Sequence, residues 1–434
     1  MKRILSIVGI IALIAAIILI AYFLFGRGTS VTPPGEHGPG TPQGGLLPPG
    51  TPPQPTTETG GLIGQDGSLL PVVDPTKLSK EARAVFEAVA QNPVADYFVR
   101  EDSSVLLIQP DGKVVKIANK EEEVLSDSTD PSLATASFSP DGKYILTMSE
   151  DKEQKRLFST FNITSRSWQL LSDGAILSAA WAPTGAKLVY LTSPAPSGKS
   201  SLAILDLAAE TPSPQPLLSL YQQDMRVAWP KPDEVVLYSP PSAEAEGSMW
   251  KVSVTKKTIV PIDDQSRGRV TKWSRLGSAM LSYSFQGRTA RNGTYILTTA
   301  DNSFYLSATF PTKCAFDSHI TTEGDTGAAR EEVTALYCAV PRNENDFLSH
   351  ELPDDYFAKA FFTLDRFRKI DPQDGSSVLI FDEPEVNVDA TNLKVFGNDL
   401  YFVNRYDQRL YVIHIDEALK RIGEELTPND GDAQ

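Results

Sequence analysis

ATASFSPDGKYILTMSE, residues 134–150, alternates apolar and polar side chains on both sides of a central Pro140-Asp141-Gly142. Alternation with a period of two is typical of a β-strand that buries one face. Asp-Gly between two such runs is typical of a tight hairpin turn, because glycine adopts a positive φ without steric cost. The stretch therefore predicts two antiparallel strands joined by a short turn.

Related stretches recur after this hairpin and read SAAWAPTG, RVAWPKPD, VTKWSRLG, KCAFDSHI and LKVFGNDL, starting at Ser178, Arg226, Val270, Lys313 and Leu393. The aromatic residue that ends the first strand recurs at spacings of 43, 48, 44 and 43 residues, at Phe138, Trp181, Trp229, Trp273 and Phe316. Further candidate strands complete four per unit. Repeats of about 40 to 50 residues with four strands are typical of β-propeller blades.

The predicted fold class is therefore all-β, a propeller over residues 95–416 with six or seven four-stranded blades, of which seven is favoured. Strand candidates at both ends of this region are expected to combine and close the ring. The five repeated aromatics are interpreted as packing residues wedged between adjacent blade sheets rather than as catalytic residues.

Phe138 to Gly142, FSPDG, resembles the repeat of TolB-like, WD-repeat-like propellers of bacterial envelope proteins, in which Trp or Phe precedes Ser-Pro-Asp-Gly. The other copies, such as WAPTG and WSRLG, keep the aromatic and vary the turn. The resemblance implies a propeller fold in a cell-envelope setting, for a membrane-anchored member of that group.

Ile4–Phe25 contains 22 residues without a charge, which is long enough for a helix to cross a bilayer. Lys2 and Arg3 precede this span, so the positive-inside rule places residues 1–3 in the cytoplasm and the rest outside. We expect an uncleaved, single-pass anchor in the cell membrane. Residues 26–75 are rich in proline and glycine and predict a disordered stalk.

Residues 76–91, TKLSKEARAVFEAVAQ, space their apolar side chains by three and four, which predicts a short helix ahead of the β region. A second helical pattern begins at Asp416, so residues 417–434 are expected to form a short helix and a polar tail. The net charge of −15 disfavours a nucleic-acid partner, because acidic surfaces repel phosphate backbones.

Cys314 and Cys338 are the two cysteines of the chain. In the 134–150 hairpin, paired residue numbers sum to 283, which pairs Phe138 with Ile145. By alignment on Phe316, Cys314 corresponds to Ala136, whose partner would be Thr147, and Cys338 corresponds to Leu146 or Thr147. The cysteines are thus expected to face each other within about one residue on neighbouring strands, and a disulfide is predicted, with two buried thiols as the alternative.

Two insertions, Asp317–Thr334 and Arg342–Phe357, enlarge the blade that holds the cysteines, and both are expected to project on one face. The second insertion contains Asp354, Asp355, Tyr356 and Phe357, which combine charge with aromatic surface suited to recognition. These four residues are the predicted binding residues, with solvated surface as the alternative.

The chain contains no GxSxG or HExxH motif, and its four histidines show no metal-ligand spacing, so no metal or cofactor is expected. The leading hypothesis is a non-enzymatic extracytoplasmic propeller that binds a protein or glycan partner in the cell envelope. One alternative is an envelope enzyme, glycosidase-like or lyase-like, with carboxylates at the centre of the ring. The other is a structural spacer or surface-display protein.

Overall fold

The computed structural model describes residue 73 and residues 77–426, except for 154, 173–175, 222–223, 286–292, 307–308 and 324–327. The predicted membrane span at 4–25 lies outside the described residues, as do the stalk apart from Val73 and the tail from 427. Among the described helices, none is long and apolar enough to cross a membrane.

Five antiparallel sheets of the described residues contain four strands each. The first three follow the chain in order. They consist of β2 (Asp96–Val99), β3 (Val105–Ile108), β4 (Val114–Ala118) and β5 (Glu121–Ser126); β6 (Leu133–Phe138), β7 (Tyr144–Glu150), β8 (Arg156–Asn162) and β9 (Ser167–Ser172); and β10 (Ile176–Trp181), β11 (Lys187–Thr192), β12 (Ser200–Asp206) and β13 (Gln215–Leu220).

A seven-stranded sheet comes next and is built around one long strand. It contains β14 (Arg226–Lys231), β15 (Glu234–Tyr238), β16 (Glu246–Ser253), β17 (Ile259–Trp273), β18 (Met280–Phe285), β19 (Thr294–Thr298) and β20 (Ser303–Tyr305). The first part of β17 pairs with β16 and its second part with β18, with Arg267 in both ladders. The sheet is thus two four-stranded halves that share β17.

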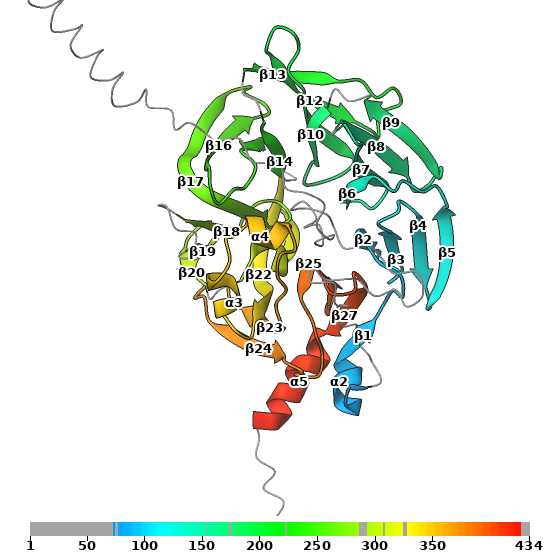
Figure 1. Cartoon of the computed structure of the whole chain (residues 1–434), viewed down its shortest axis with the longest axis vertical. Helices are drawn as coiled ribbons and strands as arrows, with labels where there is room; N and C mark the ends of the chain where they lie inside the picture. The colour runs from blue at the N-terminus through cyan, green and yellow to red at the C-terminus, as the bar shows by residue number, and fades with distance from the viewer. Residues whose placement is uncertain are drawn as a thin grey trace, which may run out of the picture. The chain divides into compact units, whose positions relative to one another are not determined.

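The last two sheets complete the domain. One holds β21 (Cys314–Glu323), β22 (Ala328–Pro341), β23 (Asp365–Ile370) and β24 (Ser377–Phe381); the other holds β25 (Ala390–Phe396), β26 (Asp399–Asn404), β27 (Leu410–His414) and β1 (Phe86–Ala88). Since β1 comes from the start of the domain and pairs with β27, the two ends close the ring, as expected. Radially arranged sheets around one axis confirm the all-β prediction, and the domain is a β-propeller (Figure 1).

The predicted helix at 76–91 is wrong in its second half. Helix α2 spans Lys80–Val85, and the chain then enters β1, in which Phe86 pairs with Ile413. The ring of Phe86 is buried and stacks 5.1 Å from Tyr411 and 5.5 Å from Phe381. Ladder hydrogen bonds and this aromatic packing come from the far end of the chain and override the local helical pattern. Helix α5 (Ile415–Leu426) lies where the second helix was predicted.

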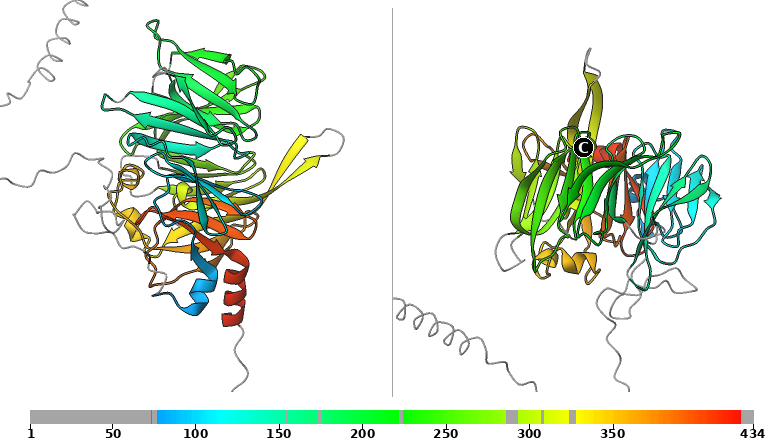
Figure 2. Two further views of the ribbon diagram at one scale, coloured as in Figure 1. Left: turned by 90° about the vertical axis from the view of Figure 1, so that its right-hand side faces the viewer. Right: turned by 90° about the horizontal axis from the view of Figure 1, so that it is seen from above.

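The two insertions leave the enlarged blade on opposite faces, which corrects the expectation of a shared face. The first is the β21–β22 hairpin, which extends beyond the ring as an arm, and the second carries α3 (Asn345–Leu348) and α4 (Asp354–Phe357) on the other side (Figure 2). The physical reason is the antiparallel ladder, in which successive connections lie at alternate ends of the sheet.

The β21–β22 ladder pairs Cys314 directly with Cys338, and the two form a disulfide with their Cα atoms 4.1 Å apart. Both side chains are fully buried. The predicted disulfide is confirmed, and so is the register on which it depended, since Phe138 pairs with Ile145 in the reference hairpin.

Candidate functional site

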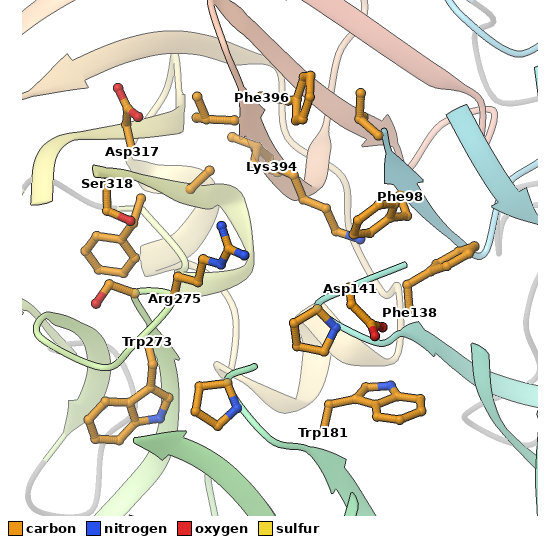
Figure 3. Close-up of a pocket in the computed structure, with 18 of the residues that line it drawn as sticks. Phe98, Phe138, Asp141, Trp181, Trp273, Arg275, Asp317, Ser318, Lys394 and Phe396 are labelled. Carbon is orange, nitrogen blue, oxygen red and sulfur yellow. The ribbon is translucent and has the colours of Figure 1, made fainter. Parts of the chain in front are cut away.

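A wide cavity opens at the centre of the ring, on the face where the innermost strands end (Figure 3). Its volume is about 1500 Å³, and we call it the central funnel. The innermost strands are β2, β6, β10, β14, β17, β21 and β25, and each contributes to the wall. The lining segments are residues 98–102, 138–141, 181–183, 228–230, 271–275, 315–319 and 393–398.

Every innermost strand places one aromatic side chain on the wall of the funnel. The seven residues are Phe98, Phe138, Trp181, Trp229, Trp273, Phe316 and Phe396. Five of them were predicted as blade-packing residues, whereas Phe98 and Phe396 were missed. Both stand in stretches that align with the other copies, DYFVRED at 96–102 and LKVFGNDL at 393–400, so the repeat itself carried the signal.

The aromatic side chains also contact neighbouring sheets. The indole N–H of Trp181 donates to the carbonyl of Ser137 on β6 over 3.1 Å, and the rings of Phe98 and Phe138 lie 6.1 Å apart. Phe138 and Trp229 are only 7% and 8% exposed. The rings of Phe138 and Trp229 therefore offer limited surface to the funnel, whereas the other five aromatic side chains are half-buried.

Gly142 connects the FSPDG turn to this wall. Its φ is +65°, and a β-carbon at this position would stand 2.4 Å from the ring of Phe98. Any larger residue would therefore be strained by its backbone and would displace an aromatic ring of the funnel. The FSPDG turn therefore requires glycine at position 142 for two reasons, the positive φ and the close approach of the Phe98 ring.

Asp96 on β2 is hydrogen-bonded to residues of two other sheets, those that contain β6 and β25. Its carboxylate accepts hydrogen bonds from the backbone N–H of Phe138 (3.0 Å), from Asn392 (2.8 Å) and from the ammonium of Lys394 (2.6 Å). Asp96 is 5% exposed, and Lys394 also lies 4.4 Å from the ring of Tyr97. Both carboxylate oxygens of Asp96 therefore accept hydrogen bonds that connect neighbouring blades.

Lys272 on β17 donates to the carbonyl of Leu393 on β25 over 3.0 Å. Burial lowers the pKa of its ammonium to about 8, and the positive charge of Lys394 acts in the same direction, while Asp96 partly offsets both. Lys272 is half-buried and forms no ion pair within the described residues, and a cation in such a position is a cost to folding. Such costs are often found where a ligand binds.

Replacement of Lys272 by methionine is expected to raise the free energy of unfolding near pH 7 by on the order of 1–2 kcal/mol. The folded state binds fewer protons than the unfolded state between a pKa of about 8 and the ordinary value of 10.5. The cost of the lysine is therefore complete below pH 8 and shrinks as the pH rises toward 10.5. Thermal unfolding across this pH range measures the difference. Lys251→Met, at an exposed lysine, is the control, and a pH-independent gain would contradict the prediction.

The charges of the wall are segregated by blade. The residues from β10 and β14 carry no charge and are Trp181, Ala182, Pro183, Ala228, Trp229 and Pro230. Lys272 and Lys394 come from β17 and β25 and Arg275 from the turn after β17, whereas Glu101, Asp102 and Asp141 follow β2 and β6. Arg100 stands beside the acids, and Asp317 on β21 stands between the two basic segments. The funnel therefore has an apolar sector, a mainly basic sector and a mainly acidic sector.

No protein-family model and no curated protein matches the chain. Among solved structures, an oligogalacturonate lyase from Vibrio parahaemolyticus is 10% identical, with a TM-score of 0.49, covering 76% of this chain and 93% of the lyase. The β-propeller domain of the Trilobed protease from Pyrococcus furiosus is 13% identical, with a TM-score of 0.46, covering 74% of this chain and 95% of that domain. The likeness is one of fold.

The predicted binding residues Asp354, Asp355, Tyr356 and Phe357 form α4, which lies on the side of the domain away from the β21–β22 arm (Figure 2) and does not line the funnel. Tyr356 is 3% exposed and packs 4.5 Å from Phe310 and 4.0 Å from the guanidinium of Arg405, so its prediction as recognition surface is wrong.

The two acids of α4 have structural contacts. Asp354 accepts a hydrogen bond from the backbone N–H of Ala243 over 2.5 Å, and Asp355 accepts from that of Glu351 over 2.8 Å. Phe357 remains 49% exposed. The insertion folds onto the domain because its aromatic side chains bury together, and the sequence pattern does not distinguish such packing from an exposed recognition loop. Within the described ranges, no group of three or more His, Cys, Asp or Glu could hold a metal ion.

Proposed function

We propose that the chain is a membrane-anchored, extracytoplasmic β-propeller that binds a protein or glycan partner of the cell envelope at its central funnel. The span at 4–25 supports the anchor, and the excess of basic residues before it supports the orientation. The disulfide fits an oxidising compartment.

The proposed ring has seven blades. The seven-stranded sheet counts as two blades that share β17, and each of the other five sheets counts as one. Seven innermost strands at the funnel wall support this count, since each supplies one aromatic side chain.

The observation that carries the proposal is the funnel itself. At about 1500 Å³ it exceeds the 300–1,000 Å³ usual for small-molecule sites, so a segment of a macromolecule suits it better. Three carboxylates of the centre accept hydrogen bonds, since Asp96 has three donors, Asp141 accepts from the Ser139 hydroxyl over 2.6 Å and Asp102 accepts from the Ser104 hydroxyl over 2.5 Å. Glu101 and Asp317 also line the funnel, on different blades. The engagement of the first three acids favours binding over catalysis by paired carboxylates, which requires acids that are free to exchange protons.

Photocrosslinking in the cells that make the protein tests the proposal. A photoreactive amino acid at Asn398, exposed on the rim of the funnel, is expected to capture one partner reproducibly. The same probe at Ser165, exposed in the turn between β8 and β9, is the matched control. Equal capture from both positions, or none from the rim, would argue against a binding role for the funnel.

Removal of residues 1–30 tests the anchor. The truncated protein is expected to leave the membrane fraction and remain folded, because the described core lies entirely after residue 72. Sedimentation and circular dichroism measure both properties. A truncated protein that stays in the membrane fraction would contradict the anchor.

A further inference from the structure

Arg275 is a cation of the funnel wall for which no ion pair is found among the described residues, and Arg100, beside the acids that follow β2, is another. It is exposed in the turn between β17 and β18, and Figure 3 shows its side chain extending into the funnel. Lys272 and Lys394 on the same side donate to Leu393 and Asp96. In the part of the chain that the structure describes, no ion pair includes Arg275.

The turn that carries Arg275 is held by one carboxylate from the arm. Glu331 on β22 is 8% exposed, and one of its oxygens accepts from the hydroxyl and N–H of Ser278, the hydroxyl of Ser274 and the N–H of Leu276 at 2.7–3.1 Å. Its second oxygen accepts from Ser318 over 2.8 Å. Four hydrogen bonds from the residues on either side of Arg275 fix the backbone from which the guanidinium extends.

The apolar sector of the funnel distinguishes between a peptide and a glycan as the ligand. The apolar sector offers tryptophan, alanine and proline; Trp229 is 92% buried by its neighbours and Trp181 is half-buried. The indole N–H of Trp181 donates to Ser137 and that of Trp229 to Pro232, so the side chains of this sector leave no hydrogen-bonding group for the hydroxyls of a sugar, whereas apolar side chains of a peptide need none. A peptide therefore fits this sector better than a glycan.

We propose that the funnel binds an acidic segment of a protein partner, in which a carboxylate pairs with Arg275 and neighbouring apolar side chains enter the tryptophan-proline sector. Guanidinium and carboxylate form paired, charge-assisted hydrogen bonds, so an uncommitted arginine in a partly enclosed cavity suits this ligand. Glu331 acts as a positioning residue for Arg275. This inference rests on the proposed function and names its ligand class.

Selection of random peptides displayed on phage against the full chain in detergent tests the ligand class. The enriched peptides are expected to contain Asp or Glu beside apolar residues, and Arg275→Ala is expected to weaken the best synthetic peptide at least about tenfold. Arg166→Ala, at an exposed arginine far from the funnel, is expected to leave the affinity unchanged. Glu331→Gln is expected to weaken binding about threefold or more, and to have no effect once Arg275 is alanine.

Three outcomes would overturn the inference: selected peptides without acids, an affinity unaffected by Arg275→Ala, or binding of an oligouronate probe in place of peptides. A loss caused by Glu331→Gln that persists in Arg275→Ala would assign Glu331 a structural role only. If the probe at Asn398 captures a partner but Arg275→Ala leaves the peptide affinity unchanged, the acidic-peptide ligand is rejected and the proposed binding function stands. If the probe at Asn398 captures nothing, the ligand and the proposed function are both rejected.

Discussion

Replacement of Asp389 by asparagine is expected to lower the free energy of unfolding by about 3–5 kcal/mol. Asp389 is fully buried between the last two blades, and its carboxylate accepts from Lys313 over 2.5 Å, from Arg405 over 2.6 Å and from the N–H of Thr363 over 3.0 Å. Lys313 is fully buried as well and also pairs with Asp365 over 2.6 Å. The variant would leave two buried cations with one buried carboxylate.

Each charged group of this cluster stabilises the charged form of its oppositely charged neighbours. Burial alone would lower the pKa of Lys313, but the charges of Asp365 and Asp389 outweigh it and raise the pKa. Burial alone would raise the pKa of Asp389, but Arg405 and Lys313 lower it. Both groups therefore stay charged in the folded state, and neutralising one of them leaves its partners without compensation.

Urea unfolding followed by tryptophan fluorescence measures this effect. Glu123→Gln is the matched control, because it breaks an ion pair with Arg166 in which both side chains are about half exposed, and such pairs contribute about 0–1 kcal/mol. A loss for Asp389→Asn no larger than that of the control would show that solvent reaches the cluster.

Removal of the disulfide is expected to cost about 3 kcal/mol. Cys314 and Cys338 are 24 residues apart, and closing a loop of this length restricts the unfolded chain by roughly that amount in the chain-entropy model. The double variant Cys314→Ala/Cys338→Ala should therefore unfold at a lower temperature than the oxidised protein.

Reduction provides the control for this prediction. Dithiothreitol should lower the unfolding temperature of the original chain toward that of the double variant and should leave the double variant unchanged. Mass mapping without reductant should recover the peptides of Cys314 and Cys338 linked. Free thiols in protein purified from its own cells without reductant, or equal unfolding temperatures, would contradict a stabilising disulfide.

Features that depend on local repetition were accessible from the sequence. The 134–150 stretch carries its own alternation and turn, and its copies carry the same aromatic position, so the hairpins and the repeat length follow without tertiary information. The pairing of Cys314 with Cys338 was accessible for the same reason, because register propagates along a hairpin from its turn.

Contacts between distant segments were not accessible in this way. Phe86 belongs to a locally helical pattern, yet it becomes a strand because β27, more than 300 residues later, offers a free edge. Tyr356 belongs to a segment whose composition is typical of a recognition loop, yet its side chain is buried because it packs against Phe310 and Arg405. The residues that make Phe86 a strand residue and bury Tyr356 lie far away in the sequence, so the local pattern does not predict either result.

The hairpin at 134–150 thus determined by itself the strands, the turn and the repeating unit, because hydrogen bonds and side-chain alternation within one hairpin act over a few residues. Only the tertiary structure decided that the aromatic residue of each innermost strand would line a common funnel, and that Arg275 would form no ion pair there with any residue that the structure describes. The reason is closure of the ring, which brings seven strands separated by up to about 300 residues to one axis.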